Sequence, residues 1–167
     1  MSTRSWIAHE ASLQGNAGGV VQYVYSHYDG YPSGVGLALL QHYNAKGKAL
    51  ELISGGDISI LDWDGSNVSY YAKRSSWKDS RGGSDEDWDA VKPQWKENLN
   101  NLFKVFKTKD AMMIAYLYVW QTDQQWHCYR FDSNPFNRID ELSMDKDFLI
   151  KARKDSTEDV KTIKEVA

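Results

Sequence analysis

The sequence has little of several features that would assign it to a protein class at once. A single cysteine, Cys128, in 167 residues excludes an internal disulfide framework and fits a reducing compartment. Three prolines and 12 glycines are too few for a collagen-like or low-complexity chain. No apolar run reaches the ~18 residues of a membrane-spanning helix, and the first residues lack a signal-peptide core. We therefore expect a cytoplasmic protein that does not act at a membrane.

Strong charge and catalytic motifs are also missing. Lys and Arg number 20 against 23 Asp and Glu, and the net charge is −3. Because a nucleic-acid-binding domain is usually strongly basic, we expect no direct nucleic-acid binding. No spacing matches a P-loop, a dinucleotide fingerprint, a nucleophile elbow or a zinc site. The four histidines are widely separated, so we also expect no metal and no cofactor.

Aromatic residues, in contrast, make up 13% of the chain, with seven Trp, ten Tyr and five Phe. Runs of aromatic and β-branched residues predict two hairpins, 3–9 with 20–28 and 111–120 with 126–131. Apolar spacing predicts helices from Pro32 or Ser33 onward, over 46–53, from Pro93 onward with Trp95 on its apolar stripe, and over 145–153. The order β-β-α-α-loop-α-β-β predicts an α+β fold, with helices packed on a mainly antiparallel sheet made of two hairpins.

This pattern divides the chain into one domain and a tail. Residues 1–150 are interpreted as a single α+β domain, and 151–167 as a charged tail that is helical or frayed. Within the domain, 62–92 shows no period and is predicted to be a long loop. A loop of this length inside a compact domain is functional or mobile. Four of its aromatic residues favour an ordered segment that makes contacts: Tyr70, Tyr71, Trp77 and Trp88.

The densest group of chemically capable residues runs from Tyr25 to Pro32. On a strand, Tyr25, His27 and Asp29 project to one face, and a histidine beside a carboxylate is suited to general-base chemistry. The helix expected after Pro32 offers backbone N–H groups to an anion, such as a phosphate-bearing ligand. The structural alternative is that Asp29 caps the turn, His27 hydrogen-bonds to it, and Tyr31 packs beneath the helix.

A second pair, His127 and Cys128, lies in the predicted strand 126–131. Adjacent strand residues point to opposite faces, so these two side chains are not expected to form a catalytic Cys–His pair. We expect Cys128 to be a buried or half-buried structural residue.

The motif Tyr25-x-His27-x-Asp29-Gly30-Tyr31-Pro32, with Leu39-Leu40-x-His42-Tyr43 and Gly56-Asp57-Ile58-Ser59 after it, resembles a family of small bacteriophage and prophage proteins. The resemblance covers about residues 3–61 well and is loose beyond them. The family has no established activity. Small accessory phage proteins often act on the host, including its antiviral defence, so the resemblance implies a protein of the host cytoplasm.

Three functions follow as expectations, and the residues do not decide whether the chain is an enzyme. The favoured one is an accessory binding protein that inhibits or sequesters a component of antiviral defence through aromatic-rich surfaces. Its partner is a host protein or a small nucleotide, because Trp, Tyr and Arg dominate interface energetics. The binding candidates are Tyr25, His27, Asp29, Tyr31, Tyr70, Tyr71, Arg74, Trp77, Arg81 and Trp88.

The alternatives belong to other classes. In the first, the protein is a small phosphoester or nucleotide hydrolase in which His27 is the general base and Asp29 orients it. Arg74 or Arg81 then holds the anion. In the second, it is a structural protein that self-associates, as a homodimer, through exposed aromatics.

Overall fold

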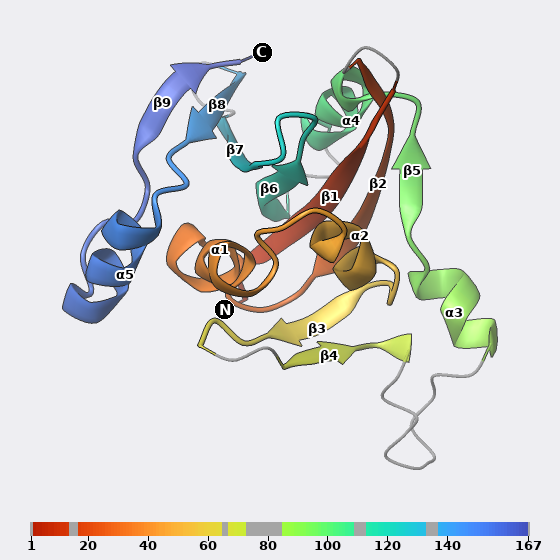
Figure 1. Ribbon diagram of the computed structural model, residues 1–167, viewed down its shortest axis with the longest axis horizontal. Helices are drawn as coiled ribbons and strands as arrows, with labels where there is room; N and C mark the ends of the chain where they lie inside the picture. Colours follow the sequence, from red (N-terminus) through yellow and green to blue (C-terminus); the bar gives the residue numbers. More distant parts are fainter. Residues whose placement is uncertain are drawn as a thin grey trace.

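The computed structural model describes residues 2–13, 17–64, 67–72, 85–108, 113–132 and 137–166, with the backbone alone at 85–87. Over these residues the fold is α+β, as predicted, with a nine-stranded mixed sheet, five α-helices and a short π-helix (Figure 1). The strands are β1 (Arg4–Ser12), β2 (Gly18–Ser26), β3 (Ile58–Leu61), β4 (Val68–Tyr70), β5 (Gln94–Lys96), β6 (Ile114–Trp120), β7 (Trp126–Asp132), β8 (Arg138–Leu142) and β9 (Thr162–Glu165). The helices are η2 (Pro32–Gly36, the π-helix), α1 (Leu37–His42), α2 (Lys48–Ile53), α3 (Asp85–Val91), α4 (Leu99–Phe106) and α5 (Lys146–Asp155).

The sheet has the strand order β4-β3-β2-β1-β6-β7-β8-β9, with β5 also paired to β2. The antiparallel pairs β1–β2 and β6–β7 lie where hairpins are predicted, but β1 pairs with β6 in parallel and β2 with β3 in parallel. The sheet is therefore larger than the two predicted hairpins, and it is mixed because two of its strand pairs are parallel. The added strands have three to five residues, which is too few for a period-two pattern to be visible.

Side chains alternate between two apolar cores on the two faces of this sheet. One face packs under η2, α1 and α2, and its buried residues include Ile7, Leu39 and Tyr118. The other face packs under α4, and its buried residues include Tyr23, Phe106 and Leu117. Full burial of a side chain such as Phe106 contributes about 1.5–3 kcal/mol. Most aromatic residues of the two hairpins are used in these cores.

The helix predicted from Pro93 begins later than expected. The Asn98 side chain accepts a hydrogen bond of 2.8 Å from the backbone N–H of Asn101, so it caps α4, which starts at Leu99. Trp95, predicted to lie on the apolar stripe of that helix, is instead in strand β5 and is 58% exposed. The stripe from Leu99 to Phe106 is apolar without it, so the spacing of Trp95 is coincidental.

The loop and the tail also contain regular structure. Strand β4 and helix α3 lie within 62–92. Helix α5 extends to Asp155 and ends at Ser156, which has a φ of 54°. Strand β9 then pairs with β8, so the predicted tail contains the end of a helix and a strand of the sheet. A four-residue strand with exposed side chains carries no burial pattern by which sequence could reveal it. In the described part of the chain, no helix is long and apolar enough to cross a membrane.

Candidate functional site

The predicted pair of His27 and Asp29 is not formed. His27 Nδ1 lies 2.5 Å from Tyr25 Oη, and Nε2 lies 3.3 Å from Ser2 Oγ. Asp29 instead accepts a hydrogen bond of 3.1 Å from Tyr31 Oη. Among the residues described, no hydrogen bond or ion pair joins His27 to Asp29. The reason is the backbone: β2 ends at Ser26, and Asp29 has a φ of 57°, so strand alternation does not continue to Asp29.

The Tyr25 and Ser2 hydroxyls can each donate or accept, so both ring nitrogens of His27 are hydrogen-bonded in either neutral tautomer. The His27 ring also packs edge-on against Tyr28, with 4.4 Å between ring centroids. Burial raises the pKa of Tyr25 above its ordinary value. These contacts hold the ring in place and leave it without the carboxylate partner of a general base.

Asp57, which belongs to the family-like motif, has a structural role at the edge of β2. Its Oδ1 accepts a hydrogen bond of 2.9 Å from the backbone N–H of Tyr25. That N–H lies between the part of β2 that pairs with β5 and the part that pairs with β3. Burial raises the pKa of Asp57 to about 6. The carboxyl group therefore replaces a missing strand partner.

The anion expected at the start of the first helix is supplied by the chain itself. Asp159 Oδ2 accepts hydrogen bonds from the Ser33 backbone N–H at 3.0 Å and from Ser33 Oγ at 2.7 Å. Arg153 Nη1 donates to the Ser33 carbonyl at 2.9 Å, and its guanidinium lies 4.2 Å from the centre of the Trp63 ring. The segment after α5 is thus tied to the residues that follow Asp29 and Tyr31.

These contacts border an open cavity of about 570 Å³. Its lining residues are polar or small: Tyr31, Ser33, Ala152, Arg153, Ser156, Thr157 and Asp159. The two strongest charges of the cavity, on Arg153 and Asp159, are each bonded to Ser33. The two charged groups of the cavity therefore already have partners within the protein.

Tyr70 and Trp88, predicted to contact a ligand or a partner, support the fold. Tyr70 Oη donates a hydrogen bond of 2.6 Å to the Leu52 carbonyl, and burial raises the pKa of Tyr70 to about 12. Its ring lies where a Cβ on Gly55 would be. A Cβ on Gly56 would lie 2.8 Å from Trp88 Cζ3. The two glycines thus provide the space in which both rings pack.

Of the remaining binding candidates, the structure describes Tyr71. Tyr71 donates its backbone N–H to the Asp57 carbonyl at 3.1 Å, close to Tyr25. Arg74, Trp77 and Arg81 lie outside the described residues. The anion clamp of the hydrolase hypothesis is therefore not placed.

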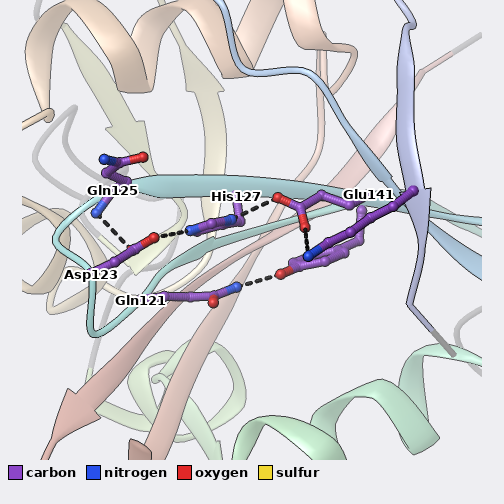
Figure 2. Close-up of polar contacts among 7 residues, drawn as sticks. Gln121, Asp123, Gln125, His127 and Glu141 are labelled. Atoms are coloured by element: carbon purple, nitrogen blue, oxygen red, sulfur yellow. Dashed lines mark hydrogen bonds and ion pairs between the residues drawn. The ribbon is translucent and has the colours of Figure 1, made fainter. Parts of the chain in front are cut away.

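A polar network that sequence reasoning missed surrounds His127 (Figure 2). His127 Nε2 lies 2.7 Å from Asp123 Oδ2, and Nδ1 lies 2.7 Å from Glu141 Oε2. Each contact needs one proton, carried by the ring nitrogen when the facing carboxyl group is ionised. The network joins the β6–β7 turn to β8, and Lys164 on β9 adds an ion pair of 3.8 Å to Glu141.

Two further contacts and the burial of Cys128 limit what this region can do chemically. Gln125 donates its backbone N–H to Asp123 at 3.1 Å, and Gln121 donates to the Tyr129 hydroxyl (Figure 2). Cys128 is fully buried on the opposite face, as adjacent strand residues must be, and burial raises the pKa of its thiol. Over the described ranges no group of three or more His, Cys, Asp or Glu side chains is arranged to hold a metal ion.

The exposed surface that sequence reasoning missed is centred on Trp95. Trp95 borders a groove of about 380 Å³ between the end of α3 and β5. The residues of this groove, hereafter the Trp95 groove, are Asp89, Ala90, Lys92, Pro93, Gln94 and Trp95. The capping residue Asn98 was the signal in the sequence that separates Trp95 from the helix. The chain matches no protein-family model, no curated protein and no solved structure.

Proposed function

We propose that this chain is an accessory binding protein that acts by covering a surface of a partner protein, and that Trp95 is the centre of the contact. The observation that carries the proposal is the 58% exposure of the Trp95 side chain beside a groove. Most other tryptophans of the described chain are buried or half-buried. A large apolar ring left in water gains free energy when a partner buries it, and tryptophan is enriched among the residues that dominate binding.

The chemistry of the other sites favours binding over catalysis. His27 lacks contact with Asp29, and Cys128 is buried, so neither supplies an activated group at the surface. The net charge of −3 disfavours a polyanionic partner and is compatible with a protein partner. The resemblance to small bacteriophage proteins makes a host protein, such as a component of antiviral defence that this chain inhibits or sequesters, the expected partner.

The test is photo-crosslinking of the full chain in an extract of the host cell. A photoreactive amino acid replaces Ala90, an exposed residue of the Trp95 groove, or Ile150, an exposed residue of α5 on the other side of the molecule (Figure 1). We expect one defined adduct from position 90 and none from position 150.

Competition decides whether that adduct depends on Trp95. Unlabelled wild-type protein should suppress the adduct, whereas unlabelled Trp95→Ala should need about 30-fold more protein, since loss of a central tryptophan costs about 2 kcal/mol. Tyr28→Ala, which truncates another exposed aromatic, should compete like the wild type. Equal competition by Trp95→Ala and wild type would refute the proposal.

A further inference from the structure

Among the described residues, strand β5 pairs along one edge only, and the direction of its backbone groups can be derived. The Tyr25 N–H donates to Asp57 and thus points away from β1. Backbone groups of a strand alternate in direction, so those of Tyr23 and Val21 also point away from β1, toward β5. Their register partners are Gln94 and Lys96, which therefore bond to β2.

Trp95 lies between these two residues, opposite Gln22, and its own N–H and C=O point outward. No other strand within the described ranges pairs with β5, which lies at the margin of the fold (Figure 1). One residue of β5 thus presents both a donor and an acceptor of the kind that an incoming strand takes up. The same residue carries the most exposed ring among the described aromatics.

The groove beside this edge has room for a side chain. Its volume of about 380 Å³ is larger than the ~150 Å³ cavity that holds benzene in an engineered protein. Pro93 and the Trp95 ring supply apolar wall, and Ala90 keeps the other side open because its side chain is small. An apolar side chain that extends from a strand paired with Trp95 fits this space.

The charge of the residues near the groove determines which partner segments bind well. Helix α3 has four acidic residues among its seven (Asp85, Glu86, Asp87 and Asp89), and only two lysines lie between it and the end of β5. One of these, Lys92, is 3.5 Å from Asp89 and is partly neutralised. A segment with basic residues is therefore attracted toward α3 and an acidic one is repelled.

We propose that the Trp95 groove binds an extended, basic segment of the partner protein, which adds as a strand to β5 and places an apolar side chain beside the Trp95 ring. This inference rests on the proposed function and specifies the chemistry of its partner. Strand addition supplies main-chain hydrogen bonds, and the groove accepts one apolar side chain of the partner. The acidic helix α3 favours a partner segment with basic residues.

The test uses defined peptides with the full chain. The probe is a fluorescent peptide Thr-Lys-Val-Leu-Val-Lys-Thr, and its counterpart has Glu in place of both Lys. Two further versions are N-methylated, one at Leu and one at both Val, because strand pairing uses the N–H groups of alternate residues. Binding is followed by anisotropy, and hydrogen exchange of the Trp95 backbone amide by NMR.

We expect the basic peptide to slow exchange of the Trp95 amide at least tenfold and to leave the amides of Gln94 and Lys96 unchanged. The acidic peptide and one of the two methylated peptides should bind at least tenfold more weakly. Trp95→Ala should weaken binding at least tenfold, whereas Tyr28→Ala should not change it.

Three results would overturn the inference. Equal binding of the basic and acidic peptides would remove the charge selection. Equal binding of both methylated peptides, or an unprotected Trp95 amide at saturation, would remove strand addition. Protection that increases with protein concentration in the absence of peptide would make a second copy of the chain the occupant. If any of these occurs while the adduct from position 90 still depends on Trp95, the proposed binding function stands and this inference fails.

Discussion

Replacing Asp57 with asparagine should stabilise the protein at neutral pH. Asp57 Oδ1 accepts the Tyr25 backbone N–H at 2.9 Å, and an asparagine carbonyl accepts the same hydrogen bond without a charge. Burial raises the pKa of Asp57 from 3.8 to about 6, so the folded protein holds the carboxylate less favourably than the unfolded chain does. Asp57→Asn removes that cost and keeps the contact.

The size and the pH dependence follow from this shift. Two pKa units correspond to about 3 kcal/mol, and partial solvent exposure of Asp57 reduces the expected gain to about 1–2 kcal/mol. Because the folded-state pKa is raised, proton binding stabilises the wild type fully below the unfolded value of 3.8, and this stabilisation is lost as the pH rises through about 6. The advantage of Asp57→Asn should therefore be near zero at about pH 4 and complete by about pH 7.5.

Thermal unfolding followed by circular dichroism across this pH range measures the effect. We expect Asp57→Asn to raise the Tm by about 2–8 °C at neutral pH. The control Asp57→Ala leaves the Tyr25 N–H without its acceptor and should destabilise the protein by about 1–3 kcal/mol. A lower Tm for Asp57→Asn than for wild type at neutral pH, or a difference independent of pH, would refute the reasoning.

The remaining predictions concern two glycines and the cysteine. Gly47 and Gly56 have φ values of 87° and 86°, but a Cβ meets open space at Gly47 and lies 2.7 Å from the Val91 carbonyl oxygen at Gly56. In urea unfolding, Gly47→Ala should cost about 1–2 kcal/mol and Gly56→Ala about 1–3 kcal/mol more, and equal costs would contradict the packing of α3 against Gly56. Cys128 is fully buried and burial raises its pKa, so a thiol reagent should modify the native protein only as it unfolds, and rapid native modification would contradict this burial.

The sequence predicted the elements whose patterns are long enough to be specific. The two hairpins, α2 and α5 lie close to their predicted ranges, because several turns or alternations of apolar residues distinguish a helix from a strand. Strands β4, β5 and β9 have three or four residues, and their existence depends on the neighbours with which they pair. Trp95 shows the difference directly. Its spacing matched a helix, but the helix begins only after the cap at Asn98, and pairing with β2 places Trp95 in a strand.

The candidate site was predicted less completely, for reasons of geometry. The period-two argument joined His27 to Asp29, but β2 ends at Ser26 and the backbone turns at Asp29, so His27 meets Tyr25 and Ser2 instead. Tyr70 and Trp88 stood out as aromatics without a period, yet Gly55 and Gly56 leave the space in which they pack. Contacts between distant segments, such as Ser33 with Asp159, have no signal in local sequence.

The sequence by itself determined the α+β class, the positions of the main elements and the opposite directions of His127 and Cys128, because these follow from local periodicity. The tertiary structure alone decided which polar groups meet, which aromatics are buried and which remain exposed. Strand pairing and close packing bring together residues that are far apart in the chain, so no short segment of the sequence predicts these contacts. The exposure of Trp95 is the most consequential of these outcomes, since it moves the expected contact surface from the Tyr25–Pro32 motif to the edge of β5.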